Sequence, residues 1–400
     1  MELTLLGTGA PDGLPRPECP CAACATARGT RSRAATALLV DDALLLDLTP
    51  GAVFAAARAG RSLAVVRQVL LTHPHDGPAV ELPAGLPPAG RVPDGRELTL
   101  ISGHRVRAVA MDAPGTGYEV TGPEGVRLLY LPPGAAPSGL TERVARPYDI
   151  VVGDVVGRPD AVARLRAVGA VGPHTEIVAV HLDHDAPPGA ELDRRLAAAG
   201  ARAVPDGTTL VVGEYRATPP APRRTLVTGG ARSGKSVEAE RRLETFPEVV
   251  YVATGGRREG DADWADRIGL HRERRPAAWR TEETCELVEL LAADGPPLLI
   301  DCLSLWLTDA MDRVDAWDDT AWAGGGRSAL RKRTAELVAA VRATRRTVVA
   351  VTNETGSGVV PATAAGRRFR DELGRLNAAV AEECEQVLLV VAGQVLTLRG

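Results

Sequence analysis

The sequence predicts an α/β protein of two domains. Residues 1–215 are expected to form an α/β sandwich, and residues 224–400 a parallel sheet with helices on both faces, joined by a linker at 216–223. Three observations support this. The chain has 400 residues, which is too many for one ordinary hydrophobic core. All five tryptophans lie beyond residue 260. Residues 217–223 combine Ala, Pro and Arg without a hydrophobic period, as short stiff linkers do.

The first half consists of short apolar runs separated by stretches rich in Pro and Gly. Each run has the length and composition of a β-strand, and the runs are LTLLG, ALLV, ALLLDL, VRQVLLT, RLLYL, DIVVGDVV and EIVAVH. Helical patterns are fewer and cover residues 51–60, 159–168 and 190–200. Many short strands with a few helices favour a sandwich over a doubly wound sheet.

The second half alternates strands with helices. Strands are predicted at 224–228, 248–253, 297–301, 346–352 and 386–392. Helices are predicted near 235–245, 262–273, 284–292, 328–344 and 364–384. This alternation predicts a parallel sheet that is covered on both faces. Ligands of such a sheet bind beyond the carboxyl ends of its strands.

Composition and charge narrow the classes of partner. The formal net charge is −4, which gives no electrostatic reason to expect binding to nucleic acid or to an anionic membrane. The first residues, MELTLLGTGAPDG, have neither a basic leader nor a long apolar core, so no secretory signal is expected. No uninterrupted apolar run approaches twenty residues, so no membrane span is expected. We therefore expect a cytoplasmic protein.

Residues 229–236 fit the pattern G-x-x-x-x-G-K-[ST], which binds nucleotide phosphates. The strand TLVT precedes this loop and the helical stretch SVEAERRL follows it. Backbone N–H groups and Lys235 would contact the phosphates, and Ser236 would bind Mg²⁺. Only Lys235 and Lys332 are lysines in a chain that otherwise uses Arg. The expected phosphate-binding residues are Gly229, Gly230, Ala231, Arg232, Ser233, Gly234, Lys235 and Ser236.

A Mg²⁺ site also needs a carboxylate at the end of a neighbouring strand. Asp301 follows the apolar run PPLLI. An acid at that place either binds the metal or caps the next helix, and the phosphate loop favours the metal. Asn353 and Glu354 end a third strand, at the edge where substrate should lie.

The segment DRIGLHRERRPAAWRTEE contains His271, the only histidine beyond residue 223. A neutral imidazole can attack the α-phosphate of a nucleoside triphosphate to give a phosphoramidate. The arginines that follow would offset the negative charge. From spacing alone, an exposed histidine at the end of a charged helix is the stronger interpretation.

The second domain resembles the bifunctional adenosylcobinamide kinase/adenosylcobinamide-phosphate guanylyltransferases of cobalamin biosynthesis. The matching segments span nearly all of 224–400 in the family's order, and they are LVTGGARSGKS, YVATG, RIGLHRERRPAAWRTEE, the strand ending at Asp301, VVAVTNETGSGVVP and RRFRDELGRLN. The resemblance implies an enzyme that phosphorylates the aminopropanol hydroxyl of adenosylcobinamide with GTP or ATP. It then transfers GMP from GTP onto that phosphate through a guanylyl-histidine and releases pyrophosphate.

The same resemblance assigns roles to residues. His271 and Lys235 are the expected catalytic residues, and Ser236 and Asp301 the expected Mg²⁺ ligands. Beyond the phosphate loop, the GTP site is expected to include Thr254, Gly255, Gly256, Arg272, Glu273, Arg274, Arg275, Glu283 and Asp301. The implied partners are adenosylcobinamide, GTP and further copies of the chain, because members of the family are typically trimers.

The first domain resembles the metallo-β-lactamase fold, an αββα sandwich, and within it the phosphodiesterase-like members. The motifs that carry the resemblance occur in the fold's order, and they are GTGAPDGLPRPECPCAACA, LLTHPHDGP, DIVVGDVVG and IVAVHLDHD. The two-metal centre of that fold uses H-x-H-x-D-H. His73 and His75 match its first two positions, whereas Gly77 and Pro78 occupy the last two.

Other ligands of that centre are also missing. The mid-domain histidine is absent from AVAMDAPGTGYEV, and Asp154 and His181 are the late candidates that remain. A hydrolytic dinuclear site needs more ligands than these. We therefore expect a degenerate active site in a domain that serves as scaffold or partner surface.

Three cysteines, Cys19, Cys21 and Cys24, lie within six residues. In a cytoplasmic chain such a cluster indicates a metal site rather than disulfides, and it supplies three of the four ligands of a structural zinc site. In the phosphodiesterase-like relatives the fourth ligand is a histidine three residues after the last catalytic one, which corresponds to His184 after His181. The alternative is three free thiols, which would be prone to oxidation.

Two other functions stay open at this stage. One is a regulatory or assembly ATPase that uses the phosphate loop, with the first domain as its interaction module. The other is a first domain that retains metal-dependent phosphodiesterase activity. A covalent GMP–histidine adduct would separate the enzyme from the ATPase, and the metal content of the first domain would test the phosphodiesterase.

Overall fold

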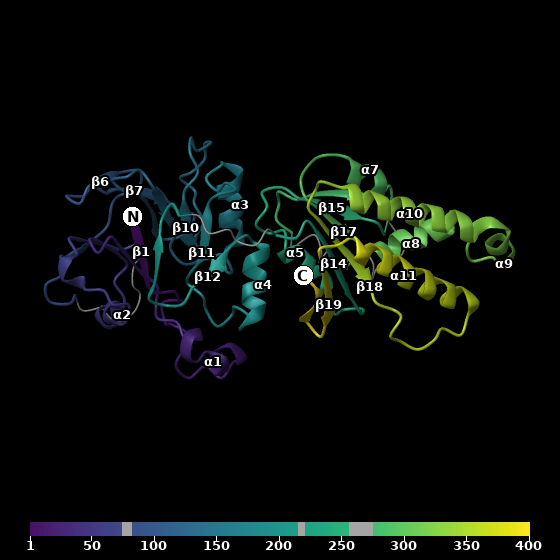
Figure 1. Cartoon of the computed structure of the whole chain (residues 1–400), viewed down its shortest axis with the longest axis horizontal. Coiled ribbons are helices and arrows are strands. Elements are labelled where there is room, and N and C mark those ends of the chain that lie inside the picture. The colour runs from purple at the N-terminus through teal and green to yellow at the C-terminus, as the bar shows by residue number, and fades with distance from the viewer. Residues whose placement is uncertain (74–81, 215–220, 256–274) are drawn as a thin grey trace. The chain divides into compact units, whose positions relative to one another are not determined.

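The computed structural model describes residues 1–73, 82–214, 221–255 and 275–400 (Figure 1). The chain folds into two compact units, Met1–Ala221 and Pro222–Gly400. Each unit has its own sheets and its own hydrophobic core.

The described part of the N-terminal unit contains two mixed sheets. One has six strands in the order β13-β1-β2-β3-β4-β5, with the bounds Thr208–Val211, Glu2–Gly7, Ala37–Val40, Leu44–Leu46, Gln68–Leu70 and Ala89–Gly90. The other has seven strands in the order β12-β11-β10-β9-β8-β7-β6, with the bounds Arg202–Ala203, Glu176–Ala179, Ile150–Gly153, Arg127–Tyr130, Thr116–Thr121, Arg105–Ala110 and Glu97–Thr99.

The two sheets face each other across the main core of this unit. Leu38 of β2 and Tyr118 of β8 are both fully buried in that core. Helix α2 (Ala52–Arg58) packs on the outer face of the first sheet. Helices α3 (Pro159–Ala167) and α4 (Ala190–Ala198) cover the outer face of the second sheet. These four layers confirm the predicted αββα sandwich.

The seven strands and three helices predicted for this unit are all present. The prediction omitted β5, β6, β7, β8, β12 and β13. In β7, the exposed Arg105 and Arg107 alternate with the buried Val106 and Ala108. A strand that buries only one face has no continuous apolar run, so β7 lacks the pattern on which the prediction of strands relied. The short helices α1 (Ala22–Thr26), η1 (Gly29–Arg31) and η2 (Leu63–Val65) complete the described unit.

The C-terminal unit is built on one sheet, whose described strands have the order β16-β15-β17-β18-β14-β19-β20. Their bounds are Arg280–Glu283, Val250–Ala253, Leu298–Asp301, Val348–Asn353, Arg224–Gly229, Gln386–Val391 and Gln394–Arg399. The five predicted strands are confirmed. These five strands pair in parallel, as predicted, and the additional strand β20 pairs with β19 in the antiparallel direction. The edge strands β16 and β20 are mostly exposed and lack the apolar run of a buried strand.

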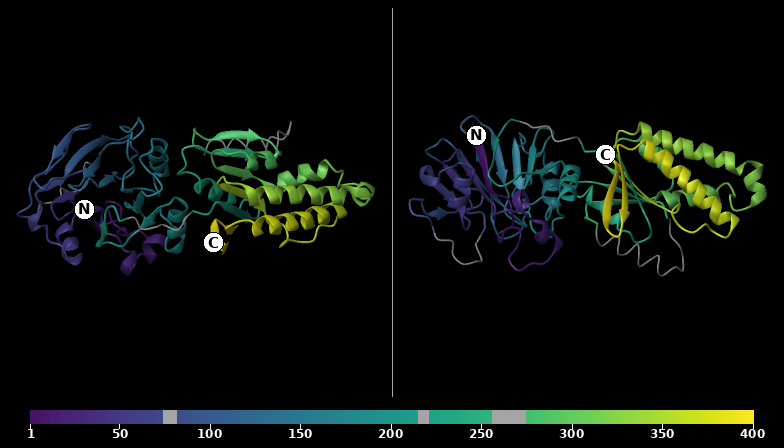
Figure 2. Two further views of the ribbon diagram at one scale, coloured as in Figure 1. Left: turned by 45° about the horizontal axis from the view of Figure 1, so that its top comes forward. Right: turned by 60° about the horizontal axis from the view of Figure 1, so that its bottom comes forward.

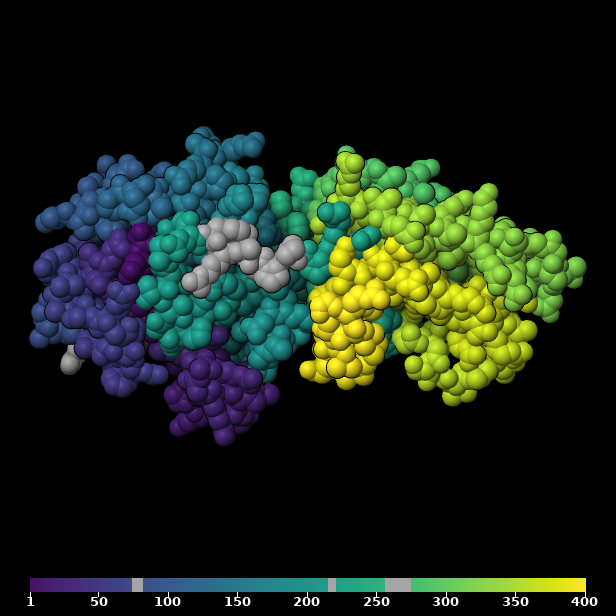
Figure 3. Space-filling model, viewed as in Figure 1, coloured from purple at the N-terminus to yellow at the C-terminus, as the bar shows by residue number. Residues whose placement is uncertain are grey.

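Helices cover both faces of this sheet, as predicted. Helix α5 (Lys235–Arg241) packs on one face through Ala239. The other face is covered by α7 (Leu287–Ala292), α8 (Leu303–Asp312), α10 (Arg327–Ala343) and α11 (Ala364–Glu382). Helices α10 and α11 lie side by side in both views of Figure 2. In Figure 3, α11 and the C-terminal strands form the yellow surface of this unit.

The segment LLIDCLSLWL stays mostly apolar from strand β17 into helix α8. Because no change of pattern separates the two elements, helix α8 was not predicted. The predicted helix at 262–273 lies outside the described residues. The short segments α9 (Asp319–Ala321) and η3 (Trp322–Gly326) lie between α8 and α10. Within the described parts of the chain, no helix combines the length and the apolar character that crossing a membrane requires.

Trp306 of α8 anchors the core of the C-terminal unit. Its side chain is 1% exposed, and its Nε1–H donates to the carbonyl of Cys285 at 3.0 Å. We expect Trp306→Ala to destabilise the protein by about 3–5 kcal/mol, because it leaves a large cavity. The exposed Trp317 is the matched control, and Trp317→Ala should cost less than about 1 kcal/mol. Urea unfolding followed by circular dichroism measures both, and equal losses would contradict this role for Trp306.

Candidate functional site

The phosphate loop, residues 229–236, connects the end of β14 to the start of α5. A Cβ atom on Gly229 would lie 2.4 Å from the carbonyl oxygen of Val390, so no larger residue fits there. Gly234 has a φ of 98°, a left-handed conformation that favours glycine, and α5 begins at the next residue. The motif therefore needs glycine at these two positions for different reasons: close approach to a neighbouring strand at Gly229, and a left-handed backbone at Gly234.

Contacts from both neighbouring strands hold this loop. The backbone N–H of Glu354, just after β18, donates to the carbonyl of Gly229 at 3.0 Å. The turn between β19 and β20 donates an N–H to the carbonyl of Ser233 at 2.9 Å. Lys235 is 5% exposed, and its Nζ donates to the carbonyl of Gly230 at 3.2 Å. The ammonium thus lies over the backbone of the loop that the motif uses to bind phosphate.

Strand register brings other polar residues to the edge where the loop lies. Gly229 pairs with Asn353 in the parallel ladder of β14 and β18. Ala253 pairs with Asp301 on one side and with Glu283 on the other. Asp301, Asn353 and Glu283 therefore sit at the carboxyl edge of the sheet together with the phosphate loop, as the alternation of strands and helices predicted.

Hydrogen bonds fix Asp301 at this edge. The hydroxyl of Tyr251 donates to its Oδ2, and the backbone N–H of Thr254 donates to its carbonyl at 3.1 Å. The hydroxyl of Thr254 accepts from the N–H of Cys302 at 2.8 Å and donates to the carbonyl of Cys302 at 2.7 Å. The carboxylate of Asp301 and the hydroxyl of Ser236 are hard oxygen donors of the kind Mg²⁺ prefers. The residues present therefore fit that ion.

A second group of hydrogen bonds lies at the ends of β17 and β18. The Nδ2 of Asn353 donates to Ser304 Oγ at 2.7 Å, and Ser304 Oγ lies 2.8 Å from the Sγ of Cys302. Asn377 of α11 accepts from the hydroxyl of Thr352 at 2.7 Å and donates to the carbonyl of Asn353 at 3.0 Å. Asn353 was predicted at this edge, whereas Ser304 and Asn377 were not, because these contacts join segments that are distant in sequence.

A cavity of 370 Å³ opens beside this edge. Its walls come from the ends of β15 and β16 and from α8, and its lining residues are Ala253, Thr254, Gly255, Glu283, Thr284, Cys285, Leu305, Thr308, Asp309, Asp312 and Arg313. Three of them, Thr254, Gly255 and Glu283, were predicted nucleotide-site residues. The wall from α8 was missed together with the helix. Hydroxyl, carboxylate and guanidinium groups lie in this cavity beside apolar side chains, a mixture that sites for small molecules commonly show.

Part of the predicted site cannot be placed. Gly256, His271, Arg272, Glu273 and Arg274 lie outside the described residues. Arg275 is described, and its guanidinium Cζ lies 3.1 Å from the centroid of the Tyr251 ring. Its Nη1 donates to the hydroxyl of Thr281 at 3.4 Å. Arg275 therefore contacts the sheet at Tyr251, whose hydroxyl donates to Asp301.

In the N-terminal unit, the ligand atoms of Cys19, Cys21, Cys24 and His184 all lie within 4.8 Å of one another. The Nδ1 of His184 is 3.1 Å from the Sγ of Cys19 and 3.9 Å from that of Cys21. A backbone N–H of Cys24 near its sulfur lowers the pKa of Cys21 to about 7, which favours the thiolate that binds metal. Three thiolates and one imidazole are a donor set that suits tetrahedral zinc. The structure thus brings together four residues separated by up to 165 positions.

The histidines that match the two-metal motif are arranged differently. His73 Nδ1 lies 2.8 Å from the hydroxyl of Thr72 and 3.9 Å from a carboxylate oxygen of the buried Asp47. His75, Gly77 and Pro78 lie outside the described residues. Burial lowers the pKa of His181 to about 3, and its Nε2 is 3.1 Å from the carbonyl of Leu131. Neither His73 nor His181 belongs to a group of three potential metal ligands among the described residues.

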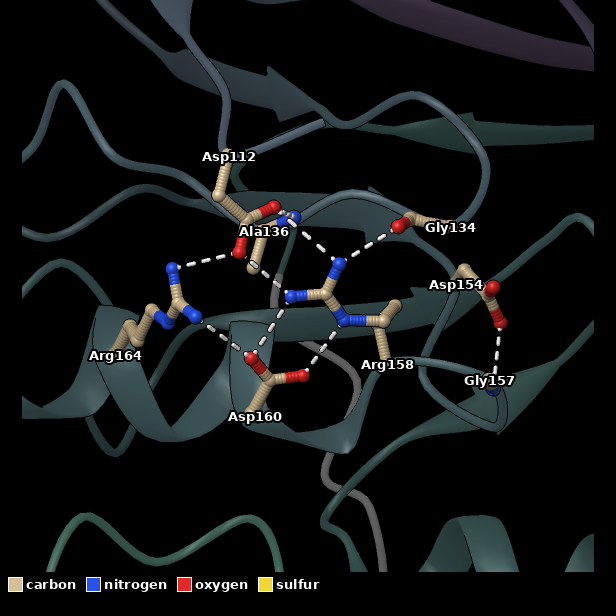
Figure 4. Close-up of polar contacts among 8 residues, drawn as sticks. All are labelled: Asp112, Gly134, Ala136, Asp154, Gly157, Arg158, Asp160 and Arg164. Carbon is tan, nitrogen blue, oxygen red and sulfur yellow. Dashed lines mark hydrogen bonds and ion pairs between the residues drawn. The ribbon is translucent and has the colours of Figure 1, made fainter. Parts of the chain in front are cut away.

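Asp154 has a hydrogen-bond partner in its own turn. Its carboxylate accepts a hydrogen bond from the N–H of Gly157 at 2.7 Å, as Figure 4 shows. Next to it, Arg158 pairs with Asp112 at 2.7 Å and with Asp160 at 2.8 Å (Figure 4). Asp112 belongs to the segment from which the mid-domain histidine is missing. Both acids are thus engaged in contacts that stabilise the fold.

Comparison with known proteins concerns the two halves of the chain separately. A family model described as cobinamide kinase / cobinamide phosphate guanyltransferase matches residues 225–398. The bifunctional adenosylcobalamin biosynthesis protein CobP of Pseudomonas aeruginosa is 43% identical over 182 residues, which are 44% of this chain and 98% of the relative. The corresponding protein CobU of Salmonella typhimurium is 38% identical over 178 residues, which are 42% of this chain and 95% of the relative.

Two solved structures that are similar to this chain have low sequence identity to it. A diphosphatase from the PhnP family has a TM-score of 0.40 and 20% identity, covering 52% of this chain and 96% of that chain. The Zn²⁺-bound PqqB of Methylobacterium extorquens has a TM-score of 0.39 and 17% identity, covering 53% of this chain and 100% of that chain. Nothing about activity follows from similarity at this level.

The ion pairs around Arg158 should make stability depend on pH. Arg158 holds the pKa of Asp112 at about 2, below its ordinary value of 3.8. Because the folded-state pKa is depressed, this contribution is fully present above a pH of about 4 and is lost as the pH falls toward about 2. We expect urea midpoints measured between pH 5 and pH 2.5 to fall less steeply for Arg158→Met than for the unmodified protein. Arg146→Met, at an exposed pair with Asp149, is the control. Identical pH profiles for all three proteins would contradict this role for Arg158.

Proposed function

The chain belongs, through residues 225–398, to the cobinamide kinase / cobinamide phosphate guanyltransferase family, and on this premise we propose that it is a bifunctional enzyme of adenosylcobalamin biosynthesis. Its substrates are adenosylcobinamide and GTP, with GTP or ATP in the kinase step. The observation that carries the proposal is the phosphate loop, which shares the carboxyl edge of one sheet with Asp301 and Glu283 beside a polar cavity.

In the kinase step, the aminopropanol hydroxyl of adenosylcobinamide attacks the terminal phosphate of the triphosphate. A new O–P bond forms, the hydroxyl loses its proton and a nucleoside diphosphate leaves. Backbone N–H groups of the loop and Lys235 orient the phosphates and offset their charge. Mg²⁺ held by Ser236 and Asp301 would supply further charge neutralisation. The residues of this chain act by binding and orientation, because phosphoryl transfer asks little covalent chemistry of a protein.

In the guanylyltransferase step, we assign His271 as the nucleophile. Its neutral imidazole attacks the α-phosphate of GTP, so that a P–N bond forms and pyrophosphate leaves. The phosphate of adenosylcobinamide phosphate then attacks the same phosphorus, which breaks the P–N bond and restores the histidine. Arg272, Arg274 and Arg275 offset the charge. The contact of Arg275 with Tyr251, whose hydroxyl donates to Asp301, supports a position of this arginine near the nucleotide site.

The cavity beside β15, β16 and α8 is the proposed position of the GMP moiety. It is lined by Thr254, Gly255 and Glu283, which the family resemblance assigned to the nucleotide site. Gly256, Arg272 and Glu273 are assigned to the same site on that resemblance. We further propose that the chain forms a homo-oligomer, a trimer as is typical of the family.

For the N-terminal unit we propose a structural zinc site and a degenerate hydrolytic centre. Cys19, Cys21, Cys24 and His184 would hold the zinc, and their convergence supports this. The partners of Asp154 and His181 support the loss of hydrolytic chemistry. The unit, with proposed bounds 1–215, would then act as a scaffold or partner surface for the enzyme at 224–400.

Labelling with α-³²P-GTP tests the covalent intermediate. We expect the unmodified chain with Mg²⁺ to acquire an acid-labile, base-stable label, and His271→Ala to lose it. His174→Ala, a histidine of the N-terminal unit, should label normally. Lys235→Ala should impair both steps, because both use bound triphosphate. Kinase activity should survive better in His271→Ala than GMP transfer does, since phosphorylation needs no covalent nucleotide.

Two outcomes would contradict this assignment. If the unmodified chain takes no label during turnover, the guanylyltransferase fails and a regulatory or assembly ATPase becomes the better interpretation. If a folded His271→Ala variant loses both activities equally, His271 does not act specifically in the guanylyltransferase step.

Metal analysis of the full-length chain tests the zinc site. We expect close to one zinc per chain, and we expect Cys21→Ser to remove it and to lower the melting temperature of the N-terminal unit. Cys285→Ser, at a half-buried thiol of the C-terminal unit, is the control and should keep the zinc. Absence of metal would rule out the Cys₃His site. Two tightly bound metals with phosphodiesterase turnover would overturn the scaffold role.

A further inference from the structure

Tyr251 and Asp301 lie on the same face of the C-terminal sheet. The register pairs Tyr251 with Leu299 and Ala253 with Asp301, so tyrosine and aspartate are diagonal neighbours on adjacent strands. Residues two apart on a strand share a face, and diagonal neighbours are within reach of an aromatic side chain. Tyr251 and Leu299 pack in the same core cluster as Ala239 of α5. Tyr251 therefore approaches Asp301 from the side of the sheet that carries the helix after the phosphate loop.

Hydrogen bonds hold the backbone on both sides of the Asp301–Cys302 bond. Thr254 binds the carbonyl of Asp301 and both backbone polar groups of Cys302. The carboxylate can then vary chiefly by rotation about its own side-chain bonds. Tyr251 determines that rotation, because its hydroxyl donates to Oδ2. Within the described part of the chain, the other oxygen, Oδ1, accepts no hydrogen bond.

The Tyr251 hydroxyl is placed to donate to this carboxylate. The residue is 3% exposed, and a phenol O–H is a donor that suits a carboxylate acceptor. The guanidinium of Arg275 lies on its ring, in the geometry of a cation–π contact, and helps to hold the ring in place.

We propose that Tyr251 is a positioning residue that fixes the carboxylate of Asp301 so that Oδ1 points to the metal bound with the nucleotide. Residues that hydrogen-bond to a metal-binding side chain commonly orient that side chain and raise the affinity of the site for the ion. Tyr251 contacts both Asp301 and Arg275, so it also links the carboxylate of Asp301 to this arginine. The inference rests on the proposed function, since that function gives Asp301 its role as a metal ligand.

Tyr251→Phe tests the inference, because it removes the hydroxyl and keeps the ring under Arg275. The probe is Mn²⁺, titrated into the full-length chain saturated with GDP and followed by the electron paramagnetic resonance signal of free Mn²⁺. We expect the affinity for Mn²⁺ to fall by about 10-fold to 100-fold. The Mg²⁺ concentration that gives half-maximal GTP labelling should rise in parallel. Tyr148→Phe, which removes a buried hydroxyl that donates to Glu119 at 3.0 Å in the other unit, should change neither value.

A double-mutant cycle separates positioning from a general loss of structure. Asp301→Asn should weaken Mn²⁺ binding by itself, and adding Tyr251→Phe should then weaken it no further. Unchanged Mn²⁺ affinity in Tyr251→Phe, or full additivity with Asp301→Asn, would overturn the inference. If the unmodified chain fails to label while Mn²⁺ affinity still depends on Tyr251, the proposed function fails and the positioning role stands.

Discussion

The parallel pairing of β14 with β18 and β19 is the constraint on which the C-terminal site depends. It carries Gly229 so close to the carbonyl of Val390 that only glycine fits, and it allows both neighbouring strands to bind the loop backbone. Parallel strands end at one edge, so the residues that follow β14, β15, β17 and β18 meet there. The phosphate loop, Asp301 and Thr254 are neighbours because of this geometry, although 72 positions separate Gly229 from Asp301 in the sequence.

Buried polar groups at that edge are satisfied by one another. Thr254 is 4% exposed, and it makes hydrogen bonds to the backbone on both sides of the Asp301–Cys302 bond. Buried polar groups that lack partners would cost free energy, and networks of this kind hold one arrangement in preference to others. Thr254 therefore holds the backbone at the end of β17, next to Asp301.

The two units use their polar residues for different purposes. In the N-terminal unit, Asp154 accepts a hydrogen bond within a turn and His181 is a buried ring beside the carbonyl of Leu131. The cysteines of the N-terminal loop and His184 converge on one another.

The sequence by itself determined the two units, the buried strands, the phosphate loop and the cysteine cluster, because each is a local pattern whose steric or chemical reason lies within a few residues. The assignment of His184 as a fourth ligand beside the cysteines came from the family resemblance, and the fold brings its imidazole next to their sulfur atoms. Only the tertiary structure decided which face Tyr251 shares with Asp301, that α8 walls the cavity, and that Asp154 accepts from Gly157. Those facts depend on strand register and on helix packing. Both are set by burial summed over the whole core, which no short stretch of sequence contains.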